Sequence, residues 1–66
     1  MKAYYVLVAK EEGQWAIQFG DFDREVVEQE KLDYIDSYGG KCKVIKAREC
    51  SQSVVDAAVR SLNGGV

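Results

Sequence analysis

Three carboxylates come closest to a chemical site in type and spacing: Asp21, Asp23 and Glu25. Oxygen ligands of this kind could bind a divalent cation, or could serve a small enzyme as acid and base. The spacing is loose, however, and a helix cap explains at least one of these carboxylates without a metal. We therefore predict no metal site and no cofactor.

Other groups that catalysis commonly uses are missing or isolated. The chain has no histidine, which removes the commonest general base and the usual nucleophile pairs. Cys42 and Cys50 would lie roughly 26 Å apart along an extended strand. A disulfide needs Cα atoms within about 7 Å, so two separate reduced thiols are expected. No glycine-rich phosphate loop is present. We predict that the protein is not an enzyme.

Charge is segregated along the chain although the net charge is only −2. Seven acids fall between residues 21 and 36, against Arg24 and Lys31: Asp21, Asp23, Glu25, Glu28, Glu30, Asp33 and Asp36. Four bases and no acid fall between residues 41 and 48: Lys41, Lys43, Lys46 and Arg48. Two candidate surfaces of opposite charge follow from this pattern.

The acidic segment is predicted to be a helix over residues 24–38. At 100° per residue, five apolar side chains share the face toward the sheet, with Glu30 and Lys31 at its margins: Val26, Val27, Tyr34, Ile35 and Tyr38. The opposite face collects Glu25, Glu28, Gln29, Leu32, Asp33 and Asp36. One interpretation is a solvated face with a single exposed leucine. The other is a docking surface for a basic protein partner, with Leu32 as its apolar anchor.

The basic segment also has two interpretations. Lys41, Lys43, Lys46 and Arg48 could bind nucleic acid through its phosphates. Lysines along a strand also protect an exposed sheet edge from aggregation. We favour the protective role, since the acidity of the whole chain argues against nucleic acid as a partner.

The elements that must position these residues follow from local patterns. Residues 3–9 are apolar without alternation, which fits a central strand covered on both faces. Residues 15–19 alternate and predict a half-buried strand that Gly20 breaks. Asp23 is expected to cap the first helix, with Phe22 and Val27 as a hydrophobic staple, and Gly39-Gly40 to end it.

Residues 41–48 predict a third strand, at a sheet edge or with a bulge, because Val44 and Ile45 interrupt its alternation. A second helix is expected to begin after a cap at Ser51 or Ser53 and to run to about residue 62. The predicted fold is therefore a single α+β domain with element order ββαβα. Its three-stranded antiparallel sheet has the order 2-1-3, and both helices pack on one face. The open second face would be apolar and could support a homodimer.

No stretch approaches the length of about 20 apolar residues that crosses a membrane, and the residues after Met1 do not resemble a signal peptide. We therefore expect a cytoplasmic protein without a membrane partner.

Two segments resemble small proteins of unknown function encoded by bacteria, phages and prophages. The first is Trp15-Ala-Ile-Gln-Phe-Gly-Asp-Phe-Asp-Arg-Glu25 and the second is Asp56-Ala-Ala-Val-Arg-Ser-Leu-Asn63, together about a third of the chain. The resemblance implies a bacterial or phage origin and a single short domain, and it carries over no functional residues.

These observations favour a non-enzymatic module that binds a protein partner of unknown identity through the acidic helix face. A phage-encoded inhibitor of host defence, of the anti-CRISPR or anti-restriction type, is one form that such a module could take. A nucleic-acid-binding accessory that uses the basic strand is the alternative.

Overall fold

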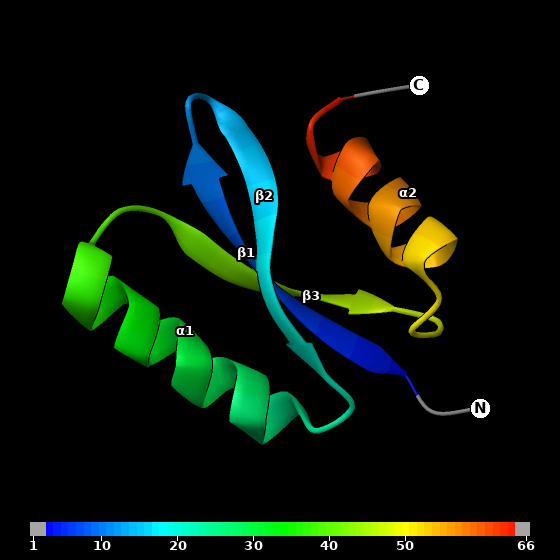
Figure 1. Cartoon of the computed structure of the whole chain (residues 1–66), viewed down its shortest axis with the longest axis horizontal. Coiled ribbons are helices and arrows are strands. Elements are labelled where there is room, and N and C mark those ends of the chain that lie inside the picture. The colour runs from blue at the N-terminus through cyan, green and yellow to red at the C-terminus, as the bar shows by residue number, and fades with distance from the viewer. Residues whose placement is uncertain (1–2, 65–66) are drawn as a thin grey trace.

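A computed structural model describes residues 3–64. Five elements follow one another along the chain (Figure 1): β1 (Tyr4–Glu11), β2 (Gln14–Asp21), α1 (Arg24–Tyr38), β3 (Cys42–Ala47) and α2 (Gln52–Leu62). The strands form one antiparallel sheet in the order β2-β1-β3, which confirms the predicted order and the α+β class. Neither helix has the length and apolar composition that crossing a membrane requires, among the residues described.

The central strand β1 supplies most of the buried core. Val6, Leu7, Val8 and Ala9 are each at most 1% exposed. Successive side chains of a strand point to opposite faces, so this run presents one apolar strip to each side of the sheet. A strand with this composition is stable only in the middle of a sheet whose two faces are both covered.

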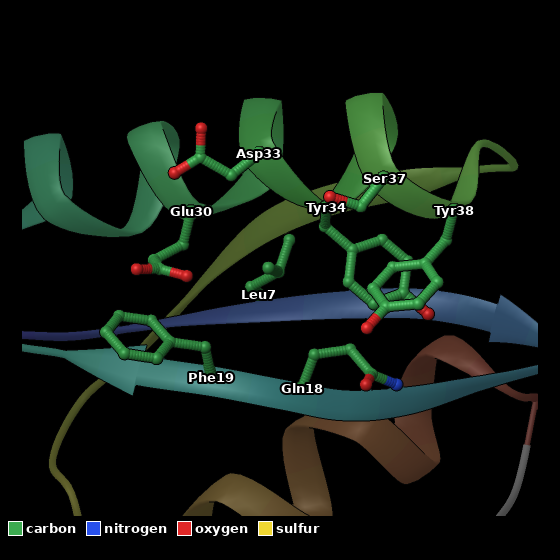
Figure 2. A pocket seen from close by; sticks show the side chains of 8 residues that line it. All are labelled: Leu7, Gln18, Phe19, Glu30, Asp33, Tyr34, Ser37 and Tyr38. Atoms are coloured by element: carbon green, nitrogen blue, oxygen red, sulfur yellow. The ribbon is translucent and has the colours of Figure 1, made fainter.

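The two helices lie on opposite faces of the sheet, which corrects the prediction that both pack on one face. Val6 and Val8 form a core cluster with Val55 and Val59 of α2. Leu7, on the other strip, lies beneath α1 (Figure 2). The reason is that both strips of β1 need cover, and each helix supplies it for one strip. The open apolar sheet face expected as a homodimer surface is therefore absent from the described part of the chain.

The junction between β2 and α1 follows the predicted cap but not the predicted break. The Asp23 carboxylate accepts a hydrogen bond from the backbone N–H of Glu25 at 2.9 Å, which satisfies a free donor of the first turn. Gly20, in contrast, stays within β2 and pairs with Val6. A Cβ atom at Gly20 would lie under 3.0 Å from the phenol end of Tyr4. Glycine is thus needed here to seat the Tyr4 ring rather than to break the strand.

A turn and a bulge shape the β1–β2 hairpin. Glu12 and Gly13 both have positive φ, which is the backbone of a two-residue hairpin turn that suits the twist of the strands. Leu7 pairs with Phe19 whereas Val8 pairs with Ile17, so Gln18 is an extra residue in β2. The bulge predicted as one option for β3 is wrong, since β3 pairs with β1 in an unbroken register, at the sheet edge.

The C-terminal end of α1 is capped as predicted, whereas the N-terminal end of α2 is not. Gly39 caps the C-terminal end of α1; it has a φ of 73° and donates its N–H to the carbonyl of Ile35. Ser51 precedes α2 as expected, but its hydroxyl donates to Glu49 Oε1 at 2.8 Å and does not cap the helix.

Asn63 fastens the end of α2 to the outer edge of β2. The Trp15 N–H donates to Asn63 Oδ1 at 2.6 Å, and Asn63 Nδ2 donates to the Trp15 carbonyl at 3.1 Å. One side-chain amide therefore satisfies both backbone groups of Trp15, as a neighbouring strand would. The contact also closes an otherwise free position on an edge strand.

Replacing Asn63 with alanine is expected to lower the free energy of unfolding by about 1–2 kcal/mol, because two hydrogen bonds are lost. Asn63→Asp keeps the acceptor and loses the donor, so we expect an intermediate effect. Urea unfolding measures both, with Ser61→Ala, at an exposed position two residues away, as the control. Equal midpoints for Asn63→Ala and Ser61→Ala would show that the amide does not fasten α2.

Candidate functional site

Two of the three carboxylates nearest the β2–α1 junction accept hydrogen bonds from the backbone. Asp21 Oδ1 accepts from the N–H of Asp23 at 2.8 Å, and Asp23 accepts from the N–H of Glu25. Within residues 3–64, no three histidine, cysteine or carboxylate side chains gather in a way that could hold a metal ion. The junction is therefore explained by turn and cap hydrogen bonds.

The two cysteines are free thiols, as predicted. Burial raises the pKa of the Cys42 thiol above its ordinary value, and the nearby Lys31 lowers it by a smaller amount. The net shift is upward, so Cys42 is a thiol at neutral pH rather than the thiolate that acts as a nucleophile.

The acidic face of α1 is the outward face formed by Glu25, Glu28, Gln29, Leu32, Asp33 and Asp36. Leu32 has 58% of its surface exposed, more than any other aliphatic side chain among the large exposed hydrophobic residues. Helical spacing places Glu28 one turn before it and Asp36 one turn after it. The structure therefore sets an exposed leucine among carboxylates, on the side of α1 away from the sheet.

Three members of the acidic face, Glu28, Gln29 and Asp33, form side-chain contacts within the helix. Glu28 forms ion pairs with Arg24 at 3.4 Å and with Lys31 at 3.5 Å. The Gln29 side chain donates to Asp33 Oδ1 at 3.2 Å. Exposed pairs of this kind contribute well under about 1 kcal/mol and are easily exchanged for a partner's groups.

The bases of the third strand do not gather on one surface. Lys43 pairs with Val8 and lies on the α2 face, where its ammonium sits 4.5 Å from the centroid of the Trp15 ring. Lys46 pairs with Tyr5 and so lies on the other face. Lys41 and Arg48 flank the strand just beyond its two ends. This division suits protection of an edge strand better than a continuous track for phosphates.

A groove runs between α1 and β2, on the face of the sheet that α1 covers (Figure 2). Its volume is about 340 Å³, and its walls are formed by Leu7, Gln18, Phe19, Glu30, Asp33, Tyr34, Ser37 and Tyr38. The α1 residues fall at i, i+3, i+4, i+7 and i+8, which is one stripe of the helix. The bulge in β2 turns both Gln18 and Phe19 toward this stripe. We call this feature the α1–β2 groove.

The groove has an apolar base and a polar rim. Leu7 lies at its base, and the Tyr34 and Tyr38 rings are tilted against each other with centroids 4.8 Å apart. The Glu30 carboxylate hangs into the space above Phe19, whereas the Asp33 carboxylate points away from the sheet (Figure 2). Gln18 is fixed by a hydrogen bond from Nε2 to Glu11 Oε2 at 2.7 Å.

Tyr34 keeps its proton at neutral pH. Desolvation raises the pKa of its hydroxyl above the ordinary 10.0, and the charge of Glu11 raises it further. The hydroxyl therefore remains a hydrogen-bond donor beside the groove.

Helical periodicity places Asp33 on the acidic face but does not predict the groove. Glu30 is expected only at the margin of the sheet-facing stripe, and Gln18 is expected on the opposite side of β2 from Phe19. The groove lies where α1 packs loosely on the sheet, which helical periodicity alone does not predict. Of the five apolar residues predicted to face the sheet, Val27 alone is buried, and Val26, Ile35 and Tyr38 are 40%, 39% and 78% exposed.

Comparisons with protein-family models, curated proteins and solved structures find no match to this chain.

Proposed function

We propose that this protein is a non-enzymatic module that binds a basic protein partner through the acidic face of α1, in the cytoplasm of a bacterium. The observation that carries the proposal is the exposure of Leu32 within a surrounding set of carboxylates. An apolar anchor ringed by charge is the usual anatomy of a protein–protein contact: the anchor supplies affinity, and the ring supplies orientation and rate.

The packing of α1 supports this assignment. The helix is 15 residues long but buries only Val27 fully against the sheet. Its structural role therefore leaves most of its surface free, including the three turns that carry the acidic face. A helix surface of this kind can be presented to a partner without disturbing the core.

Leu32→Glu is expected to weaken partner binding by at least about tenfold, since it removes the anchor and adds like charge to the surface. Wild-type and variant proteins, immobilised, would be exposed to lysate of the source organism, and the captured partner's affinity would then be measured by calorimetry. Ser61→Glu makes a comparable acidic change at an exposed position of α2 and is expected to bind as wild type. Unchanged circular dichroism would show that both variants are folded.

A partner that Leu32→Glu and Ser61→Glu retain equally would contradict the proposal. A captured nucleic acid in place of a protein, released by moderate salt, would favour the basic third strand instead.

A further inference from the structure

The α1–β2 groove carries aromatic surface without a cation to cover it. Tyr38 is 78% exposed although its ring lies against Tyr34, and Phe19 lies at the other end of the same groove. Elsewhere in the molecule the partly buried Trp15 ring has the ammonium groups of Lys10 and Lys43 over it, at 4.9 and 4.5 Å from its centroid. Among the described residues, no lysine or arginine lines the groove.

The charge at the groove is negative and uncompensated. Both ion pairs found among residues 3–64 involve Glu28, so neither includes Glu30 or Asp33. The Glu30 carboxylate points into the groove, and none of the hydrogen bonds found in the described part of the chain involves its side chain. A carboxylate beside aromatic rings is the arrangement that attracts a cation with a flat or apolar body.

We propose that the α1–β2 groove holds an arginine side chain of the protein partner. The guanidinium group would lie against the Phe19 ring and donate hydrogen bonds to the Glu30 carboxylate above it, while Asp33 at the rim adds negative charge. This assignment rests on the proposed function, because the groove adjoins the acidic face of α1 and the two surfaces share Asp33.

Arginine fits this groove better than lysine for two physical reasons. Its planar group stacks on aromatic rings and meets a carboxylate through two parallel N–H donors, which a single ammonium cannot do. It is also more weakly hydrated, so its transfer from water to a half-open groove costs less. A charged group is needed in either case, because a neutral side chain would leave the Glu30 carboxylate partly desolvated without a partner.

The test uses three short peptides that differ in one side chain: acetyl-Gly-Arg-Gly-amide, its lysine counterpart and its citrulline counterpart. Citrulline has the shape of arginine without the charge. Titration into the isotope-labelled 66-residue protein, followed by NMR, is expected to shift the backbone amides of Phe19, Glu30 and Tyr34 with the arginine peptide. A single side chain should bind with a Kd on the order of 1 mM.

Glu30→Gln is expected to weaken binding of the arginine peptide by about tenfold, because a charge-assisted hydrogen bond is lost. Glu12→Gln makes the same chemical change in the hairpin turn, outside the groove, and should bind as wild type. Equal shifts with the citrulline or lysine peptide would overturn the assignment. So would arginine-dependent shifts confined to the outer surface of α1.

The outcomes separate this inference from the proposed function. If the arginine peptide does not enter the groove but Leu32→Glu still abolishes partner binding, the groove assignment fails and the acidic face stands. If the peptide binds in the groove while Leu32→Glu and Ser61→Glu retain the partner equally, the proposed docking surface fails and the arginine site stands by itself.

Discussion

An aspartate in place of Val27 is expected to release α1 from the sheet and to unfold the domain. Val27 is fully buried and is the one α1 side chain in the core. A buried charge without a partner costs about 3–5 kcal/mol, and a domain of this size has a total stability of about 5 kcal/mol. Far-ultraviolet circular dichroism and urea unfolding would measure the loss of helix and the shift in midpoint.

Val26→Asp is the matched control for this experiment. Val26 precedes Val27 in the first turn of α1 but is 40% exposed. An acid there also interacts favourably with the positive end of the helix, so we expect a change within about 0.5–1 kcal/mol, of either sign. Similar unfolding midpoints for the two variants would mean that α1 is held by its partly exposed tyrosines and Lys31 rather than by Val27.

Gly20→Ala is expected to destabilise the fold by about 1–3 kcal/mol, the usual range for overpacking. In the interior of a strand, alanine is normally more stabilising than glycine. Local propensity alone would therefore predict that Gly20→Ala raises the stability of the fold. The added methyl group would lie under 3.0 Å from the phenol end of Tyr4. The ring must then shift, and this disturbs its edge contact with Phe22 at a centroid distance of 5.0 Å. The midpoint of thermal unfolding would measure the effect.

A double-mutant cycle with Tyr4→Leu isolates the cause. Leucine lacks the phenol end that crowds Gly20, so Gly20→Ala should be neutral or slightly stabilising in that background. A coupling free energy near zero would show that the glycine is needed for another reason.

Much of the fold follows from local signals. Asp23 and Gly39 define the ends of α1 because a cap and a left-handed turn depend on neighbouring residues alone. The place of β1 in the sheet follows from its unbroken apolar run. The roles of Gly20 and Gln18 could not be predicted in this way, because each depends on the residues across the β1–β2 pair.

The placement of the two helices on opposite faces could have been inferred from the sequence of β1. A central strand that is apolar on both sides requires a cover on each side, and two helices on one face leave Val6 and Val8 or Leu7 and Ala9 in water. The sequence pattern of β1 therefore favours one helix on each face, unless a second copy of the chain covers the open side.

The acidic face was predictable and the groove was not. Helical periodicity alone places Leu32 away from the sheet, and the structure confirms its exposure. Whether Glu30 points into a groove depends on the roll of α1 about its axis and on the bulge that turns Gln18. Both are set by tertiary packing, which leaves no periodic trace in the chain.

The position of β1 at the centre of the sheet has a consequence for how the chain folds during synthesis. β1 leaves the ribosome before both β3, which pairs with it through Tyr4↔Ala47 to Ala9↔Cys42, and α2, which covers Val6 and Val8. The hairpin and α1 can form early, but one edge and one face of β1 remain exposed to solvent until residues 42–62 have emerged. We therefore expect a nascent chain that stops short of α2 to remain open to proteases and to self-association, and the domain to close in a single late step.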